Sequence, residues 1–388
     1  MTDRAEPKAV ISGIGISAIG RRTGTSALDL TEQSAAAAIA DAGLTAADID
    51  GIATMGDTLP TEIAPRLGIG DVWLSELDLG QGGLLAPVMA AIEGVAAGEA
   101  RHVLVYRTVK MMGGSVMPQD GEAPQALGEM APLITYHAYS AANWLAMHAR
   151  RHMYLYGTTK EQLGWLAVNS RRNAGLNERA VYREPITLDD YLSARPVSDP
   201  FGLLDCDVPI DGSIAVVVSI AEHASNTPHP AVRVAALGRA PLFGGWDRRA
   251  DYPNMASVEA ARDLWSRTDL GPRDVDVAEL YDGFTFLTFA WLEALGLCGV
   301  GEAGPFVEGG TRIALDGELP LNTYGGQLSA GRMHGYWVLH EACLQLRGEA
   351  GAVSGGEREA GGRQVAAPEV ALVSNGGGPL AGCMLLTR

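Results

Sequence analysis

The stretch LTAADIDGIATMGD at residues 44–57 has an echo, LGPRDVDVAELYDG, at residues 270–283. Both stretches place an Asp-apolar-Asp triplet before a short apolar run, and a helical pattern precedes each of them, at residues 30–42 and 257–268. Self-similarity of this kind indicates that one supersecondary unit occurs twice. The sequence therefore predicts two copies of one α/β unit, related by a pseudo-two-fold axis.

The order of elements around the first copy is β-α-β. Residues 9–20 begin with a β-rich run, and residues 26–42 carry the helical pattern. Thr45 and Asp48 have the spacing of a capping box, ahead of a strand near residues 51–55. This order favours a sheet that is covered by helices on both faces.

A glycine cluster lies downstream in each half. Residues 80–83 (GQGG) open a small-residue helix at residues 84–97, and Gly325 with Gly326 precedes the corresponding helix of the second half. A helix that is apolar nearly all round is typical of a buried position. We therefore expect parallel-type sheets stacked around shared buried helices. A strand is expected after each helix, at residues 102–106 and 370–374.

These elements divide the chain into three parts. The expected N-terminal half comprises residues 1–108 and 210–222, and the expected C-terminal half comprises residues 223–388. Residues 109–209 form an inserted loop or lid subdomain, rich in aromatic, methionine and basic side chains.

Four arginines of this insertion form a local basic enrichment on a chain of formal net charge −17. One interpretation is an ordinary solvated helical subdomain, and the other is a lid that meets an anionic substrate such as a nucleotide phosphate. Because a guanidinium can bind phosphate through two hydrogen bonds at once, these side chains are better candidates than lysines. They are Arg150, Arg151, Arg171 and Arg172.

The composition excludes several classes of protein. With 47% hydrophobic and 19% charged residues, the chain has the composition of a folded protein with a large core. The 46 acidic against 29 basic residues argue against a nucleic-acid-binding protein. No run approaches the ~18 apolar residues that span a bilayer, and the start MTDRAEPKAV does not resemble a signal peptide. We expect a cytoplasmic protein.

No metal, disulfide or dinucleotide site is expected. The four cysteines contain no CxxC pair and read as reduced thiols, and no grouping of the eight histidines is identified as a ligand set. Gly13, Gly15 and Gly20 do not have the GxGxxG spacing of a nicotinamide or flavin site.

Six stretches carry a likeness to one known family. They are SGIGISAIG (12–20), YGTTKEQLGWLAVNSRRNAGLN (156–177), ARPVSDPFGLLDCDVPIDGSIAVVV (194–218), ELYDGFTF (279–286), NTYGGQLSAGRMHG (322–335) and SNGGG (374–378). Together they resemble the thiolase superfamily, and within it the sterol-carrier-type thiolases or lipid-transfer proteins. The resemblance implies a five-layered α/β/α/β/α fold, a homodimer and coenzyme A thioester substrates, with coenzyme A as part of the substrate and no separate cofactor.

The catalytic positions that the resemblance assigns are all replaced in this chain. Carried over by motif, the nucleophilic Cys falls on Gln81 or Gly82, an Asn on Tyr281, a His on Arg332 and a second Cys on Ser374. A thiolate is needed to hold an acyl group covalently. Acyl transfer by the usual route is therefore not expected.

Chains of this family with Tyr at the Asn position resemble steroid side-chain retro-aldolases. These cleave a β-hydroxyacyl-CoA into a ketone and a shorter acyl-CoA, together with a small OB-fold, zinc-ribbon partner. The resemblance implies that Tyr281 takes the β-hydroxyl proton, which requires a depressed pKa. In those aldolases a second Tyr stands where this chain has Arg332. The candidates that depress the pKa of Tyr281 or pass its proton onward are Arg332, Tyr324 and His334.

The same resemblance implies the substrate-binding residues. The expected contacts are Gly82, Gly83, Gly325, Gly326, Ser374 and Gly376, with the phosphates of coenzyme A toward the four arginines of the insertion. Asp282 is interpreted as a cap of the helix that follows it. Two alternatives to the aldolase stay open: a catalytically silent scaffold that binds acyl-CoA or lipid, and a Cys-independent acyltransferase of a biosynthetic pathway. The identity of the acyl chain also stays open.

Overall fold

The computed structural model describes residues 4–55, 58–112, 131–242, 245–246, 249–351 and 362–388. Within these ranges nine strands form one mixed sheet, in the order β3-β2-β4-β7-β1-β8-β11-β10-β9. The strands are β1 (Ala9–Ile16), β2 (Gly51–Thr54), β3 (Trp73–Leu74), β4 (His102–Lys110), β7 (Asp211–Ile220), β8 (Val232–Arg239), β9 (Val277–Glu279), β10 (Val370–Gly376) and β11 (Ala381–Thr387).

The strand order has the two-fold symmetry that the repeat predicts. The order β2-β4-β7-β1 of the first half is mirrored by β9-β10-β11-β8 of the second. The halves meet where β1 pairs with β8, over Val10 with Arg233 and Ile11 with Val232. This junction is short, so most of the contact between the halves comes from side chains and helices.

The expectation of parallel-type sheets is wrong. Parallel pairing joins β2 to β3 and β4, and β9 to β10, whereas β4, β7 and β1 pair antiparallel and so do β10, β11 and β8. The reason is connectivity. The insertion leaves β4 and returns at the same end of the sheet, so β7 runs back along β4, and a short turn joins β10 to β11, which requires antiparallel neighbours.

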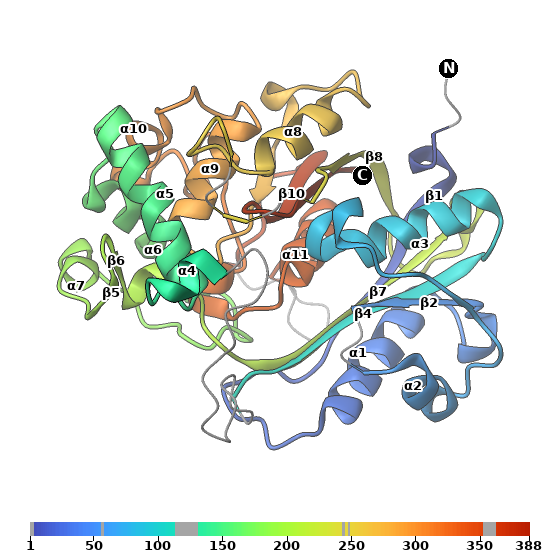
Figure 1. Cartoon of the computed structure of the whole chain (residues 1–388). Coiled ribbons are helices and arrows are strands. Elements are labelled where there is room, and N and C mark those ends of the chain that lie inside the picture. The colour runs from blue at the N-terminus through green and yellow to red at the C-terminus, as the bar shows by residue number, and fades with distance from the viewer. Residues whose placement is uncertain (1–3, 56–57, 113–130, 243–244, 247–248, 352–361) are drawn as a thin grey trace.

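Helices lie on both faces of each half and between the halves (Figure 1). The first outer layer holds α1 (Ala27–Asp41) and α2 (Pro60–Leu67), the central layer holds α3 (Ala86–Ala97) and α11 (Tyr336–Arg347), and the second outer layer holds α8 (Ser257–Trp265) and α9 (Thr285–Ala294). Five layers, α/β/α/β/α, result, as predicted.

Side-chain alternation along the strands produces this layering. On β4, Val103 and Val105 enter the central core with α3 and α11, whereas Leu104 and Tyr106 face α1. On β10 the same alternation sends Ala371 and Val373 to the centre and Leu372 to the outer core with α8 and α9. These two strands are therefore buried on both faces.

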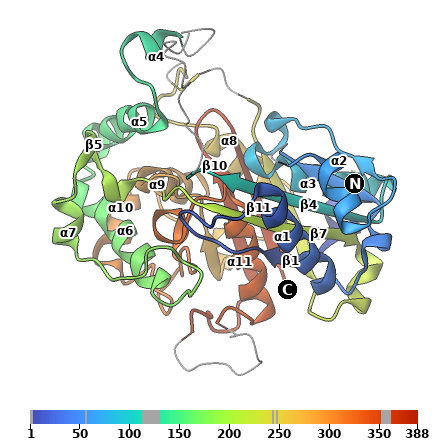
Figure 2. The same ribbon diagram turned by 90° about the horizontal axis from the view of Figure 1, so that it is seen from below.

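The insertion between β4 and β7 is mainly helical and packs on the second half. Helix α6 contacts α9, α10 (Ala303–Val307) and the π-helical segment η10 (Gly326–Ala330). Figure 2 shows α6, α9 and α10 together at one side of the molecule. Residues 113–130 lie outside the described residues, and the three-part division of the chain stays a prediction. The elements of the insertion are α4 (Ala131–Thr135), α5 (Ala141–Tyr156), α6 (Lys160–Ala174), α7 (Leu188–Leu192), β5 (Pro196–Ser198) and β6 (Phe201–Gly202).

Local signals fix most boundaries near the first repeat. Ser26 caps α1 by accepting a hydrogen bond from the Asp29 backbone N–H at 3.1 Å, and Thr45 with Asp48 forms the predicted capping box. Helix α3 begins two residues later than expected, because Gly83 starts a 3₁₀ turn, η4. The other short helices are η1 (Glu6–Lys8), η2 (Ala46–Asp48), η3 (Leu79–Gln81), η4 (Gly83–Leu85), η6 (Leu203–Asp205), η7 (Ala221–Asn226), η8 (Pro272–Asp274) and η9 (Glu308–Gly310).

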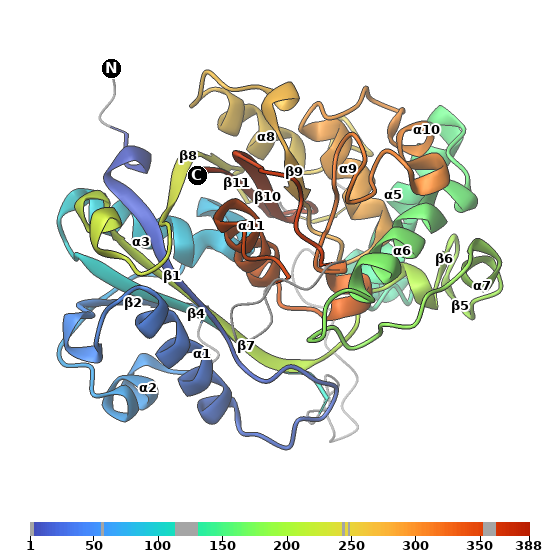
Figure 3. The same cartoon turned by 180° about the vertical axis from the view of Figure 1, so that it is seen from behind.

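Helix α11 lies between the two sets of strands. Figure 3 shows it with β1, β4 and β7 on one side and β9, β10 and β11 on the other, and its contacts include β7, β9 and β10. The loop before α11 is thereby brought to the junction of the halves. Among the described residues, no helix combines the length and the apolar character needed to cross a membrane.

Candidate active site

Tyr281 is held at the end of β9 by a residue of the neighbouring strand. Its backbone N–H donates to Ser374 Oγ at 3.0 Å, and β9 and β10 are parallel neighbours. Both residues are buried, with Ser374 at 0% and Tyr281 at 7% exposure. Ser374, expected in substrate binding, thus positions Tyr281, and a direct substrate contact stays a prediction.

Asn375 fastens the glycine turn of the first half to the second half. Its Oδ1 accepts a hydrogen bond from the Leu84 N–H at 2.6 Å, and its Nδ2 donates to the carbonyl oxygens of Gly82 at 3.2 Å and Gly382 at 3.0 Å. The amide of one fully buried side chain therefore satisfies three backbone groups. Asn375 was not predicted, although it lies in the SNGGG stretch.

The glycine turn leaves no space for a side chain. Gly82 has φ +132° and Gly83 has φ +61°, which favour glycine. A Cβ on Gly82 would lie 2.3 Å from Met89 Sδ, and one on Gly83 would lie 2.6 Å from Asn375 Oδ1. Gln81 is exposed. At Gly82, one of the two positions where the resemblance places a nucleophilic side chain, the turn therefore has only backbone atoms.

In the second glycine pair, Gly326 packs against Asp282. Gly325 and Gly326 have φ +107° and φ +62°, and a Cβ on Gly326 would lie 1.9 Å from Asp282 Oδ2. Asp282 Oδ1 accepts a hydrogen bond from the Gln327 N–H at 2.8 Å. The expectation that Asp282 caps the helix after it is wrong, because the glycine turn brings the start of η10 onto this carboxylate instead.

Asp207 and Arg332 form an ion pair next to Tyr281. Arg332 Nη1 lies 3.3 Å from Asp207 Oδ1, and Arg332 Nε donates to Met111 Sδ at 3.1 Å. Burial raises the pKa of Asp207 to about 7, while Arg332 opposes the shift and the nearby Asp282 adds to it. A carboxyl group that titrates near neutrality is suited to act as a general base. Asp207 was not predicted, although it lies in the matched stretch at residues 194–218.

The pKa of Tyr281 is raised, contrary to expectation. Burial is the main cause and the charge of Asp207 adds to it, while Arg332 and a hydrogen bond with Gln327 act in the lowering direction. Arg332 does face the phenol as predicted, but desolvation outweighs it. Tyr281 is therefore a neutral phenol, and it can accept a proton only while it passes its own proton to another base.

His334 is held by Arg107 of β4. Arg107 Nε and Nη2 lie 3.1 Å and 2.6 Å from His334 Nδ1, and the His334 backbone N–H donates to Gln327 Oε1 at 3.1 Å. Burial, Arg107 and Arg332 hold the pKa of His334 well below its ordinary value. The imidazole is therefore neutral at physiological pH. Neither Arg107 nor Gln327 was predicted.

Two further tyrosines line the same cluster. Tyr324 is fully buried and stacks on Trp337 with ring centroids 5.3 Å apart, and Tyr336 is buried beside Arg107. Burial raises the pKa of both phenols. Among the described residues neither hydroxyl has a hydrogen-bond partner. Tyr324 is near enough to Tyr281 for an electrostatic effect, and its predicted part in the proton transfer stays a prediction.

The comparisons with known proteins fit this arrangement. A family model described as "Thiolase C-terminal domain-like" matches residues 246–386. The chain is 36% identical over 360 residues to the "steroid side-chain-cleaving aldolase" of Thermomonospora curvata, which covers 88% of this chain and 90% of that protein. The chain belongs to the lipid-transfer branch of the thiolase superfamily. The residues at positions 81, 82, 281, 332 and 374, which differ from the catalytic residues of thiolases, therefore lie on the fold of this superfamily.

Two further relatives support this branch of the thiolase superfamily. The chain is 37% identical over 357 residues to the "17-hydroxy-3-oxo-4-pregnene-20-carboxyl-CoA lyase" of Mycobacterium tuberculosis, covering 88% of this chain and 92% of that protein. A solved "Ltp2-ChsH2(DUF35) aldolase" superposes with a TM-score of 0.88 at 32% identity and covers 99% of both chains.

Two arginines of the thiolase-fold insertion lie on the surface of α5. Arg150 forms an ion pair with Asp199, and Arg151 lies over the ring of Tyr154 at 5.4 Å. The side chains of Arg150 and Asp199 are more than half exposed. Their contact with a phosphate stays a prediction.

The other two arginines occupy the last turn of α6. Arg171 Nε donates to Ser329 Oγ at 2.9 Å, and its guanidinium lies over the ring of Tyr182 at 5.3 Å. Arg172 donates to Asn169 and to the carbonyl oxygen of Gly310. The four arginines share no partner in the described chain. Arg171, only 9% exposed, joins the insertion to η10.

Gly376 and the α5 residue His152 make structural contacts, and the expected contact of Gly376 with a substrate stays a prediction. Gly376 has φ +63° and accepts a hydrogen bond from Trp291 Nε1 at 3.1 Å. His148 and His152 are four residues apart, a spacing that zinc ligands use, but His152 bonds Thr158 at 2.8 Å and Glu293 at 3.0 Å instead. Within the described ranges, no group of three or more candidate ligands is placed to hold a metal ion.

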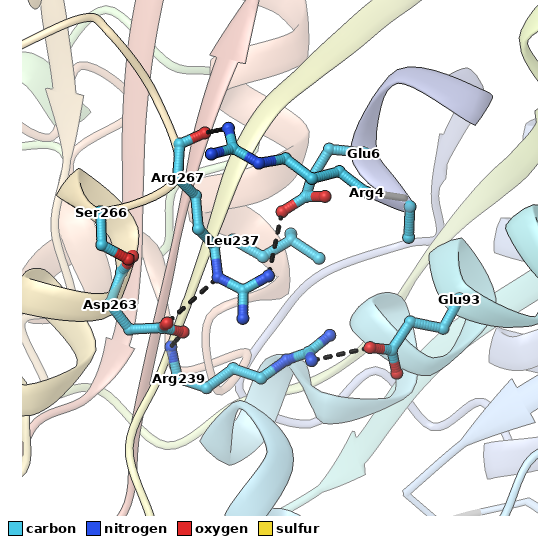
Figure 4. Close-up of a pocket in the computed structure, with 9 residues that line it drawn as sticks. Arg4, Glu6, Glu93, Leu237, Arg239, Asp263, Ser266 and Arg267 are labelled. Atoms are coloured by element: carbon cyan, nitrogen blue, oxygen red, sulfur yellow. Dashed lines mark hydrogen bonds and ion pairs between the residues drawn. The ribbon is translucent and has the colours of Figure 1, made fainter. Parts of the chain in front are cut away.

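A polar cavity of about 420 Å³ lies away from this site (Figure 4). Arg267 pairs with Glu6 at 3.4 Å and with Asp263 at 3.1 Å, and Arg239 pairs with Glu93 at 2.7 Å, while Arg4 donates to the carbonyl oxygen of Arg267. No candidate catalytic residue lines it. The lining residues are Arg4, Ala5, Glu6, Glu93, Leu237, Arg239, Asp263, Ser266 and Arg267.

Asp207→Asn is expected to stabilise the protein above neutral pH. A folded-state pKa of about 7 against an ordinary value of 3.8 means that the folded protein loses stability as the pH rises through this window. The loss in the free energy of unfolding is on the order of 4 kcal/mol above pH 7. The amide of Asn in the variant cannot ionise, so the variant avoids this loss. Urea unfolding should therefore show a gain for the variant at about pH 8 that nearly vanishes at about pH 4.

Asp199→Asn is the matched control, because Asp199 also pairs with an arginine but is 74% exposed. A surface pair of this kind contributes about 0–1 kcal/mol. A gain for Asp207→Asn that does not change with pH would show that burial of its charge is not the cause.

Proposed function

We propose that this chain is a carbon–carbon lyase that cleaves a bulky β-hydroxyacyl-CoA into a ketone and a shorter acyl-CoA. The observation that carries the proposal is the cluster of Tyr281, Asp207 and Arg332 beside a glycine turn that has no nucleophile. Relatives that match most of the chain are named as an aldolase and a lyase.

The reaction balances without an oxidant, a metal or a covalent acyl-enzyme. A base takes the proton of the β-hydroxyl group, and the carbonyl group of the ketone forms as the bond between the α and β carbons breaks. The electron pair of that bond moves into the thioester and gives an enolate. Protonation of the α carbon then yields the shorter acyl-CoA. The protein must move one proton and stabilise one developing negative charge.

Tyr281 and Asp207 can share the proton transfer. Because the phenol of Tyr281 is neutral, it accepts the β-hydroxyl proton as it releases its own proton toward a second base. Asp207, whose pKa is raised to about 7, acts electrostatically on Tyr281 and is paired with Arg332. The proton held on Asp207 is then available for return to the α carbon.

The bulky substrate is inferred from the relatives. In the compound that names the Mycobacterium tuberculosis lyase, the hydroxyl is on carbon 17 and the carboxyl thioester on carbon 20. These carbons are neighbours in the steroid skeleton, so the compound is a β-hydroxyacyl-CoA with its hydroxyl on a ring. We propose a steroid or another ring-bearing acyl group here.

A turnover assay tests the function. A β-hydroxyacyl-CoA with a ring at its β carbon should give equal amounts of ketone and shorter acyl-CoA, and intact mass should show no acyl adduct. An adduct would favour the acyltransferase alternative. Binding of the thioester without cleavage, with the partner protein present, would favour the silent scaffold. Either result would overturn the proposed lyase function.

A partner protein and a homodimer belong to the same proposal. The solved aldolase named Ltp2-ChsH2(DUF35) is a complex, which supports assay of this chain with a small OB-fold, zinc-ribbon protein. We further propose a homodimer whose interface lies near the glycine turn. A chain that sediments as a monomer at micromolar concentration would contradict this proposal. We propose that coenzyme A binds with its phosphates toward the insertion. We also propose that the protein acts in the cytoplasm.

A further inference from the structure

Arg107 directs two guanidinium nitrogens at a single nitrogen of His334. Nε and Nη2 lie 3.1 Å and 2.6 Å from Nδ1. A guanidinium stays protonated and can only donate, so Nδ1 must be the unprotonated, accepting nitrogen. In a neutral imidazole the proton is then on Nε2. The first half of the chain thereby sets the tautomer of a residue of the second half.

The charges around the ring keep it neutral. Arg107 from β4 and Arg332 from the loop of His334 itself both face the ring, and burial acts in the same direction. The remaining titratable groups of the cluster act mainly on these two cations or on each other: Tyr281, Tyr336, Asp207 and Asp282. Among the described residues no carboxylate is a partner of His334, so nothing there favours an imidazolium.

The backbone places this ring at the edge of the glycine turn. His334 has φ +53°, an uncommon value for a residue with a side chain, and its N–H is held by Gln327 Oε1. The next residue, Gly335, approaches Asn375 and Leu85, so closely that a Cβ there would lie 2.9 Å and 3.8 Å from their side chains. Backbone strain that the surroundings maintain is frequent at functional sites.

His334 Nε2 makes no hydrogen bond among the described residues. We propose that Arg107 is a positioning residue that fixes the Nε2–H tautomer, and that His334 Nε2–H donates a hydrogen bond to the thioester oxygen as the enolate forms. This inference rests on the proposed lyase function and names the group that stabilises its developing charge. A preorganised donor of this kind contributes about 10²–10³-fold to kcat.

The tautomer can be measured without any substrate. In ¹⁵N spectra of protein labelled at its eight histidines, His334 is assigned by the signals that His334→Gln removes. The parent should show an unprotonated Nδ1 and a protonated Nε2 throughout about pH 6 to pH 8. Arg107→Met removes donors and charge, so His334 should become a tautomer mixture and titrate nearer its ordinary pKa of about 6.5. Arg107→Lys should retain the Nε2–H form.

Turnover is the second readout. Arg107→Met should lower kcat about 10²-fold with little change in KM, and the acid limb of its pH profile should move to higher pH, because an imidazolium is then easier to form. Arg107→Lys should recover most of the rate. The matched control is Arg101→Met, since Arg101 is exposed just before the same strand and its variant should behave as the parent.

Several results would overturn the proposal. It fails if the parent spectrum shows a protonated Nδ1, a result that needs no variant to fold. It also fails if Arg107→Met, folded by its melting temperature, keeps the parental tautomer or the parental kcat. If instead the parent cleaves no β-hydroxyacyl-CoA, the lyase function fails, while the spectrum still decides whether Arg107 sets the tautomer.

Discussion

Tyr281→Phe should lower turnover of a ring-bearing β-hydroxyacyl-CoA by about 10²–10⁴-fold, the range expected for a lost acid/base group. The variant keeps the ring and its packing in the core, and the backbone N–H of residue 281 still donates to Ser374. The fold should therefore be preserved, and KM should change less than kcat. The measurement is steady-state kinetics, together with a thermal melt.

Tyr154→Phe is the control for this substitution, because Tyr154 is 80% exposed and also loses only a hydroxyl. If Tyr281→Phe cleaves the substrate at the parental rate, Tyr281 is a packing residue and the proton transfer proposed here is wrong. A loss of rate that accompanies a large drop in melting temperature would point to the same conclusion.

Asn375→Leu is expected to give the largest loss of stability. Leucine has the branched shape of asparagine, with two methyl groups in place of the amide oxygen and nitrogen, but it cannot pair with the Leu84 N–H or with the carbonyl oxygens of Gly82 and Gly382. Each buried group left without a partner costs about 1–3 kcal/mol. Urea unfolding should show a loss of at least about 3 kcal/mol, and turnover should fall because the glycine turn is released.

Asn254→Leu provides the comparison, since Asn254 is exposed and surface changes usually stay within about 0.5 kcal/mol. Equal stability of Asn375→Leu and its parent would mean that water or a shifted backbone replaces the amide. The fastening of the two halves by Asn375 would then be excluded.

The repeating part of the fold could be predicted because its signals are local. The echo of residues 44–57 at residues 270–283 identifies two units, and the caps at Ser26 and Thr45 are read from short spacings. Strand direction was predicted wrongly. It depends on where the long insertion returns to the sheet, and no local pattern encodes that return.

The site was predicted only where a motif carries it. Tyr281 and Arg332 stand at positions that the family motifs assign, and Tyr324 and His334 lie near Arg332 in the sequence, so they were named; their roles stay predictions. Asp207 and Asn375 also lie in matched stretches but at positions without an assigned role, and Arg107 was missed because its partner is 227 positions away. The raised pKa of Tyr281 was also missed. Sequence shows that a cation is near the phenol, but not that burial outweighs that cation.

The short pairing of β1 with β8 has a consequence for how this protein can vary. The site draws Arg107 from one half, Tyr281 and His334 from the other, and Asp207 from the insertion. Two halves that touch through so few backbone bonds depend on one another through side chains, so neither half can change at these positions alone. Chimaeras that exchange whole halves between relatives should therefore fold more often than they catalyse.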